Sequence, residues 1–292
     1  MIEVESARFP TGQSIALCVN VMYEKWAQGT WPLAGPMGNP MHSSVVDRQA
    51  QSWSDYGYRT GIWHIREQLA DAGVLATVFA NGILTEVAPD SLVALRDDGH
   101  EIAAHAWSQD QLLATLALDD ERAMVVRCRN GLAELLGRTP EGWISPRCTP
   151  SGSTPLLLAE TGFSWWGDVF DVDHPYLLET EAGTIVACPF QMELNDLPHR
   201  IRYGRSYQDF IGAWHEELAA ARRSNVPVCI DLTVHAHISG RRSGIDMLRT
   251  ILDEVKESSD VWVATKSQVL TSYGLMKESF REGSEIVDNG AT

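Results

Sequence analysis

The sequence has no paired cysteines and no long apolar run, and each absence excludes a class of protein. No stretch reaches the length of a membrane-spanning helix, and residues 1–10 show no basic region followed by an apolar run. We therefore expect a cytoplasmic protein without a secretory signal. The cysteines are scattered and never two residues apart, which argues against a disulfide framework or a structural zinc site. They are Cys18, Cys128, Cys148, Cys188 and Cys229.

Positive charge is scarce. The chain has 23 Lys and Arg residues against 39 Asp and Glu residues, giving a formal net charge of -16. An acidic surface repels the phosphates of nucleic acids and of anionic membranes, so we expect neither as a partner. Phosphate-binding loops, dinucleotide-binding glycine patterns and nucleophile elbows are absent too. We expect no cofactor of these kinds and a small-molecule substrate.

The chain also lacks an internal divider. No Pro/Gly/Ser-rich linker, repeat or low-complexity stretch interrupts its 292 residues, of which 44% are apolar. A chain of this size buries about three quarters of its unfolded surface in one fold. We expect a single domain over 1–292, with its core at about 14–273 and a polar tail at 275–292.

Short β-rich runs alternate with longer segments of helical period, which predicts a parallel sheet with helices outside. The expected strands are 14–21, 75–80, 101–104, 143–145, 163–167, 184–187, 228–233 and 261–264. The expected helices are 58–72, 89–98, 118–137, 152–161, 207–223 and 243–257. Two long irregular stretches remain, 25–55 and 188–206. The first carries Trp26, Trp31 and Trp53, and loops of this length often form lids or interfaces.

Five polar segments follow one another along the chain. They are IALCVNVMYE (15–24), GHEIAAHAWSQ (99–109), GWISPRCT (142–149), GDVFDVDHPY (167–176) and LTVHAHISGR (232–241). In this order, over roughly 14–273, they resemble the polysaccharide-deacetylase-like superfamily, which is the NodB-homology fold of carbohydrate esterase family 4. The resemblance implies a distorted (β/α) barrel with fewer than eight regular strands. In such barrels the chemistry lies at the carboxyl ends of the strands.

Within that superfamily the sequence looks most like the branch of metal-independent allantoinases, cyclic imide hydrolases and putative peptidoglycan deacetylases. The motifs that carry this likeness are Tyr56-Gly-x-Arg59-x-Gly61-x-Trp63, Gly99-His-Glu-Ile, Gly240-Arg241 and Val261-Trp-x-Ala-Thr265. Relatives in this branch resemble ring-like tetramers. The resemblance therefore implies a homo-oligomer, and a tetramer in particular.

The usual metal ligands of the superfamily are mostly missing. Metal-dependent members use an Asp-x-Asp pair after the first strand and two histidines four residues apart after the third. Here these positions align with Asn20, Met22, His105 and Gln109, so only His105 is kept. A thioether and a carboxamide are poor ligands for a catalytic divalent cation. We expect no catalytic metal. A relocated metal site built from Glu24, His105, His235 or His237 is the alternative, as is a small slip of the alignment around Met22.

Four residues are the candidate catalytic groups. His235 is the candidate general acid or base, and Glu24 is the alternative base that activates water. We expect His105 to orient water or substrate. Arg147, in a proline-stiffened turn, suits a substrate carbonyl or carboxylate because its planar guanidinium donates two parallel hydrogen bonds. Ion pairs of Glu24 with Arg59 or Arg147 are the structural alternatives.

The remaining polar and aromatic residues near these positions are candidate substrate-binding groups. By the resemblance, Asp168 and Asp173 orient His235 or bind ring N–H groups, although one of the two is expected to be structural. Most aromatic residues of this region are assigned to the core, with one or two forming a flat wall. The candidate substrate-binding residues are Asn20, Trp107, Asp168, Asp173, Asn195, Asp196 and His237.

Together these features predict a hydrolase that opens a non-peptide C–N bond in a small cyclic amide, imide or ureide without a metal. The loss of ligands beside a retained polar cluster motivates this prediction, because unpaired buried charges are costly to keep. One alternative is a metal-dependent deacetylase of an N-acetyl sugar or small acetamide. The other is a non-catalytic ligand-binding protein that has lost its chemistry together with its metal.

Overall fold

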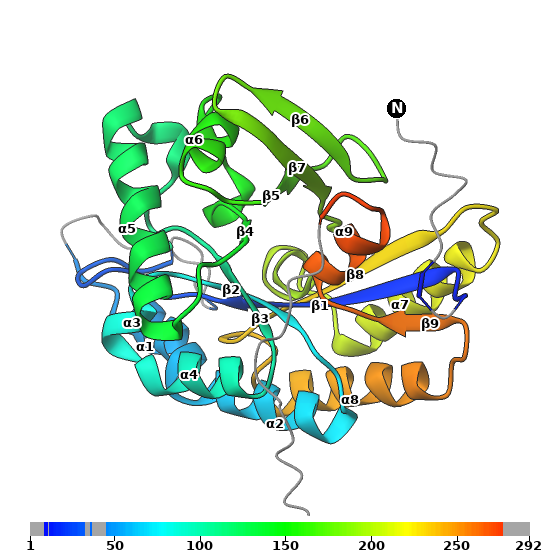
Figure 1. Ribbon diagram of the computed structural model, residues 1–292. Coiled ribbons are helices and arrows are strands. Elements are labelled where there is room, and N and C mark those ends of the chain that lie inside the picture. Colours follow the sequence, from blue (N-terminus) through cyan, green and yellow to red (C-terminus); the bar gives the residue numbers. More distant parts are fainter. Residues whose placement is uncertain (1–8, 11, 33–35, 37–44, 277–292) are drawn as a thin grey trace, which may run out of the picture.

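The computed structural model describes residues 9–10, 12–32, 36 and 45–276. Helices surround a curved sheet whose strands run through the middle of the molecule (Figure 1). The expected polar tail lies largely outside the described residues, at 277–292, as does part of the first long irregular stretch. No helix in the described ranges is long and apolar enough to cross a membrane.

Seven parallel strands form the wall of a distorted barrel in the order β7-β5-β4-β3-β2-β1-β8. Strand β9 adds to β1 in parallel, and β6 pairs with β7 as an antiparallel hairpin. A single bridge between Asn195 and Thr233 joins the loop after β7 to β8. The predicted fold is thereby confirmed. The strands are β1 (Ile15–Tyr23), β2 (Thr77–Ala80), β3 (Glu101–Ala104), β4 (Gly142–Trp143), β5 (Trp165–Val169), β6 (Tyr176–Thr180), β7 (Gly183–Pro189), β8 (Val228–His235) and β9 (Val261–Val263).

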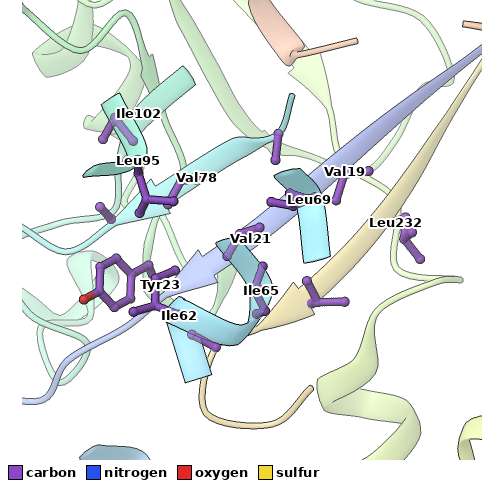
Figure 2. Packing of buried hydrophobic residues seen from close by; sticks show 14 of the residues in the cluster. Val19, Val21, Tyr23, Ile62, Ile65, Leu69, Val78, Leu95, Ile102 and Leu232 are labelled. Atoms are coloured by element: carbon purple, nitrogen blue, oxygen red, sulfur yellow. The ribbon is translucent and has the colours of Figure 1, made fainter. Parts of the chain in front are cut away.

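The main core lies between the sheet and its outer helices. Figure 2 shows β1, β2, β3 and β8 meeting α2 and α4 through interlocking aliphatic side chains. Every other residue of β1 points into this layer, as the period of a strand requires. The helices are α1 (Arg48–Tyr56), α2 (Ile62–Ala72), α3 (Leu84–Val87), α4 (Pro89–Asp97), α5 (Leu118–Leu136), α6 (Thr154–Glu160), α7 (Tyr207–Ala221), α8 (Arg242–Lys256) and α9 (Lys266–Ser272).

The alternate residues of β1 and β8 face the barrel interior, which is polar near its middle. Asp231 accepts hydrogen bonds from Lys266 at 2.8 Å and from Asn20 at 3.0 Å. Lys266 begins α9, and its ammonium group also donates to the Pro189 carbonyl at 3.0 Å. This buried ion pair therefore ties α9 to the gap between β7 and β8. Breaking such a pair by removing one partner leaves an uncompensated charge in the interior.

Glycines bring a π-helix, Gly57–Gly61, into contact with the loop that follows β8. A Cβ atom on Gly61 would lie 1.9 Å from the Ala236 carbonyl oxygen, and one on Gly240 would lie 2.5 Å from the Cα of Gly61. A Cβ on Gly57 would come within 3.1 Å of the Cβ of His237. Because no side chain fits between them, the two backbones touch. This close approach accounts for glycines in two of the segments that carried the sequence resemblance.

Several elements differ from the sequence-based expectation. The helical region begins at Arg48 rather than at 58, since α1 and the π-helix precede α2. Strand β6 and helix α9 were not predicted, because their short patterns resemble loop sequence. Strand β5 runs to Val169, so Asp168 lies within it rather than after it. The expected irregular stretch 188–206 contains the short π-helix Leu197–Arg202.

We expect Gly61→Ala to destabilise the protein by about 1–3 kcal/mol, because the added methyl group collides with a backbone carbonyl that cannot rotate away. Urea denaturation followed by circular dichroism measures the change. Gly212→Ala in α7 is the matched control, since nothing lies within 4 Å of its added Cβ. It should be neutral or stabilising by roughly 0.5–1 kcal/mol. Equal stability of both variants would contradict the proposed backbone contact.

Candidate active site

Glu24 and three histidines lie together at the carboxyl end of the barrel. Glu24 follows β1, His105 follows β3, and His235 is the last residue of β8. One oxygen of Glu24, Oε1, lies 3.6 Å from Nε2 of His105 and 3.7 Å from Nε2 of His235. The other, Oε2, lies 3.6 Å from Nδ1 of His237. A single carboxylate is therefore surrounded by three imidazoles.

Glu24 is only 3% exposed, yet its environment favours the ionised form. Burial alone raises the pKa of this carboxyl group, but His235 and the other two histidines outweigh burial and lower the pKa to about 2. The amide nitrogen of Gln109 also donates a hydrogen bond to Oε1 at 2.6 Å. The site thus contains a permanent buried negative charge at neutral pH.

His235 is held by the carboxylate of Asp196. Nδ1 of His235 donates to Oδ1 of Asp196 at 2.6 Å, and its backbone N–H donates to Oδ2 at 2.9 Å. The Ser239 hydroxyl adds a third hydrogen bond to Asp196 at 2.5 Å. Burial lowers the pKa of His235, but the charges of Asp196 and Glu24 outweigh burial and raise the pKa above its usual value. Because Nδ1 donates to Asp196, Nε2 can donate a proton only when the ring is an imidazolium, the form that the raised pKa favours. Nε2 lies 3.7 Å from Oε1 of Glu24.

His105 presents an acceptor to this space. Its Nδ1 lies 2.8 Å from the Ile144 carbonyl oxygen, which can only accept, so Nδ1 carries the hydrogen. Nε2, the other ring nitrogen, is buried without a hydrogen-bond partner among the described residues and lies 3.6 Å from Oε1 of Glu24. Asn81 holds the surrounding backbone, since it bonds Lys25 N–H at 2.8 Å and the His105 carbonyl.

His237 and two tryptophans form a wall beside Glu24. The His237 ring meets Trp53 edge-on at 4.7 Å and Trp26 at 5.6 Å between centroids. Burial lowers the pKa of His237 to about 4 despite the nearby charge of Glu24, so the ring is neutral. The guanidinium of Arg241 fixes the loop by donating to the His237 carbonyl at 3.2 Å.

These residues do not fit the divalent cation of the metal-dependent relatives. Met22 packs into an apolar cluster, and Gln109 turns an amide N–H, which cannot bind a metal, towards Glu24. In the part of the chain that the structure describes, only Cys18, Cys229 and Asp231 bring three His, Cys, Asp or Glu ligand atoms within 4.8 Å of one another. That group lies inside the barrel away from Glu24, and Asp231 already accepts from Lys266 and Asn20.

Other predicted substrate-binding residues have structural contacts. Asn20 lies deeper in the barrel on Asp231 and Thr233. Asn195 accepts from the Leu197 N–H at 3.0 Å and so shapes the backbone beside Asp196. Trp107 packs on the outer side of the sheet, with the Arg127 guanidinium 3.6 Å from its ring centroid. The side chains of Asn20 and Trp107 are thus directed to other contacts than the space beside Glu24, contrary to the prediction.

The acidic and basic residues expected near His235 do not reach it. Asp168 accepts from the Ser145 hydroxyl at 2.6 Å and from the Trp166 indole at 2.8 Å, so it braces β4 against β5. Asp173 is exposed and lines a hollow between β7 and α9. Arg147 is exposed in a left-handed turn with φ 55°, without an ion pair among the described residues. Ion pairs of Glu24 with Arg59 or Arg147 are likewise not formed.

Sequence reasoning missed three contributors to the site. Gln109 entered only as a replaced metal ligand, Ser239 was not noticed, and Trp53 was placed in a long loop without a partner. The spacing of four residues between His105 and Gln109 was the available signal for Gln109, because it predicts that both face one site. No local sequence pattern indicated Ser239 or Trp53, since each contacts residues that are distant in the sequence.

Known proteins share this architecture and much of this chain length. Residues 50–166 match the family model described as polysaccharide deacetylase. A putative polysaccharide deacetylase of Schizosaccharomyces pombe is 21% identical over 92% of this chain and 93% of its own. The crystal structure of a putative polysaccharide deacetylase from Mycobacterium smegmatis matches this chain with a TM-score of 0.77 and 28% sequence identity. The crystal structure of a PuuE allantoinase matches it with a TM-score of 0.82 and 21% sequence identity. Each match covers 91% of this chain and 92% of the other.

The fold is thus a NodB-type distorted barrel with its polar cluster at the carboxyl end. These matches agree with the resemblance to the polysaccharide-deacetylase-like superfamily that the sequence shows. The match to an allantoinase structure shows that the two chains share a fold. The similarity to polysaccharide deacetylases supports a hydrolase of carbon–nitrogen bonds.

We expect Asp196→Asn to lower the pKa of His235, because the neutral amide no longer stabilises the imidazolium. The protonated form of His235 is then lost at a lower pH than in the wild type as the pH rises. A titration of the histidine ring signals by NMR measures this shift. Asp173→Asn removes an exposed carboxylate that does not contact His235 and serves as the control. An unchanged titration of His235 in Asp196→Asn would contradict the role given to Asp196.

Proposed function

We propose that this protein hydrolyses a C–N bond in a small cyclic amide, imide or ureide, and that it does so without a metal. One observation carries the proposal: a buried, ionised Glu24 lies among histidines that differ in protonation. His235 is a donor, whereas His237 is neutral and His105 offers a lone pair. Such a set contains an acid and an acceptor within one small space, as hydrolysis requires.

The attacking water would lie between Glu24 and His105. Oε1 of Glu24 and Nε2 of His105 are 3.6 Å apart, so one water molecule can donate a hydrogen bond to each. Both of its hydrogens are then held, and its lone pair is free to attack a carbonyl carbon. As the C–O bond forms, the proton passes to Nε2 of His105. Glu24 is too weak a base for this step, but its charge stabilises the resulting imidazolium.

His235 would assist the opposite half of the reaction. Its Nε2–H first donates to the developing oxyanion and then delivers a proton to the departing nitrogen as the C–N bond breaks. Asp196 holds the ring in place through its hydrogen bonds to Nδ1 and the backbone N–H of His235. Proton return from His105 to His235 then restores the starting state, and the product is a ring-opened carboxylic acid.

The choice of a cyclic substrate rests on electrophilicity and on hydrogen-bonding capacity. An imide or ureide carbonyl is more electrophilic than that of a plain amide, and its departing nitrogen carries a delocalised charge, so a Lewis acid is less necessary. The buried acceptors of Glu24, His105 and Gln109 outnumber the donor of His235, which suits a ligand rich in N–H groups. The wall of Trp26, Trp53 and His237 suits a flat ring.

A second candidate is a deacetylase of an N-acetyl sugar or small acetamide. The match to the polysaccharide deacetylase model favours it, as does a peptidoglycan deacetylase of Helicobacter pylori, 23% identical over 64% of this chain and 75% of its own. The same acid and acceptor can act on an acetamide, although its carbonyl is less reactive. A deacetylase of the usual kind needs a metal, so elemental analysis and chelator sensitivity separate the two functions.

A hydrolysis screen tests the proposal. Cyclic imides, ureides and lactones are compared with acetylated sugars, each with and without chelator. We expect turnover of at least one nitrogen-containing ring, unchanged by chelator. Stoichiometric zinc with chelator-sensitive release of acetate would support the deacetylase instead. Tight binding of a ring without any product would support a non-catalytic binding protein.

On a ring substrate found in this way, we expect His235→Ala to lower kcat by roughly 100-fold to 10,000-fold, the range for loss of a proton-transfer group. We expect Glu24→Gln to lower kcat as well, because the neutral amide no longer stabilises the imidazolium that forms on His105. His215→Ala is the control, because His215 is an exposed histidine that pairs with Glu254 on the outer helices. Retained turnover in both active-site variants would show that the assigned groups do not perform the chemistry.

A further inference from the structure

Gln109 is a buried side chain whose second polar atom has no partner. The residue is 6% exposed, and its Nε2 donates to Oε1 of Glu24 at 2.6 Å. Its Oε1 is buried without a hydrogen bond among the described residues. A buried acceptor without a partner is costly, because it has lost its water and gained nothing in return. Gln109 therefore has a free acceptor in the immediate surroundings of the central carboxylate.

The orientation of the Gln109 amide follows from its contact with Glu24. A carboxylate has no hydrogen to donate, so the group 2.6 Å from it must be the NH2 of the amide. The reversed orientation would place two oxygens in contact. Since Nε2 donates to Glu24, Oε1 is the other end of the same planar amide group, and the two atoms cannot exchange places.

The backbone around Gln109 holds this side chain in position. Its own N–H donates to the Lys25 carbonyl at 3.0 Å, and the next residue, Asp110, accepts from the Ala27 N–H at 2.8 Å. The segment after β3 is thus fastened twice to the segment after β1. Oε1 is consequently a fixed acceptor. It belongs to the same amide group that contacts Oε1 of Glu24, the carboxylate oxygen nearest His105 and His235.

We propose that Gln109 is a specificity-determining residue: its Oε1 accepts a hydrogen bond from an N–H group of the substrate ring, next to the carbonyl that is attacked. The site then favours rings with a free N–H over N-methylated rings and over lactones. This inference rests on the proposed function, because it presupposes a ring carbonyl between Glu24 and His235. It assigns Gln109 two tasks, one for each end of its amide.

A purely supporting role predicts something different. Holding Glu24 requires only the N–H end, so loss of Gln109 would slow every substrate by the same factor. An acceptor for the substrate changes the ratio between substrates, because only the ring with an N–H loses a hydrogen bond. A site built around a hydrogen bond rejects ligands that lack it far more strongly than an apolar pocket does.

The experiment compares kcat/KM for two ring substrates that differ only by a methyl group on the ring nitrogen. We expect wild-type protein to prefer the N–H ring by about 100-fold or more. In Gln109→Met, which keeps the length of the side chain but removes the acceptor, this preference should fall to within about tenfold. Gln111→Met is the matched control, since Gln111 also has a buried unpartnered oxygen but no contact with Glu24. It should retain the wild-type ratio.

Gln109→Glu provides a second test if the Met variant does not fold. It keeps an oxygen at the same place, so the preference should persist while kcat falls from repulsion with Glu24. Loss of the preference in this folded variant would overturn the inference. So would an equal loss for both rings in Gln109→Met, and in either case the proposed hydrolysis would stand. A wild-type protein that opens no ring at all would instead remove the proposed function, and the inference with it.

Discussion

The buried negative charge of Glu24 is the interaction on which the rest of the site depends. An isolated carboxylate in a protein interior is destabilising, and here the His235 ring, whose pKa is raised, and the amide N–H of Gln109 offset much of this penalty. Their attraction keeps the group ionised, and its field in turn contributes to the charge on His235. Removing any one member changes the protonation of the others. The cluster is therefore one electrostatic unit rather than a set of independent groups.

The barrel supplies the precision that this unit needs. Strands β1 and β8 are paired along their whole length, from Ile15 with Val228 to Met22 with His235, so Glu24 and His235 are carried by adjacent strand ends. The glycines of the π-helix contact the loop after β8, and this contact fixes the position of His237. Such backbone contacts are rigid because no side chain lies between them. The geometry of the site thus depends on backbone contacts as well as on its polar side chains.

Much of the fold and part of the site were predictable. Alternating strands and helices located most elements, and the histidine positions after β3 and at the end of β8 marked the active end of the barrel. Trp107 was misplaced because it follows the end of β3, where the alternation of a strand no longer sets the direction of side chains. Asp168 was misplaced because it lies within β5 rather than after it. Arg147 was expected inside the site, but a left-handed turn directs it to solvent.

By itself, the sequence determined the periodicity of its elements and the chemical types available at each strand end, including Met22 and Gln109 in place of metal ligands. These are properties of neighbouring residues along the chain. Only the tertiary structure decided that Glu24 meets His105, His235 and His237, that Asp196 holds His235, and that one end of Gln109 stays free. Those relations join segments up to about two hundred residues apart, and their energies depend on burial and distance, which no local pattern encodes.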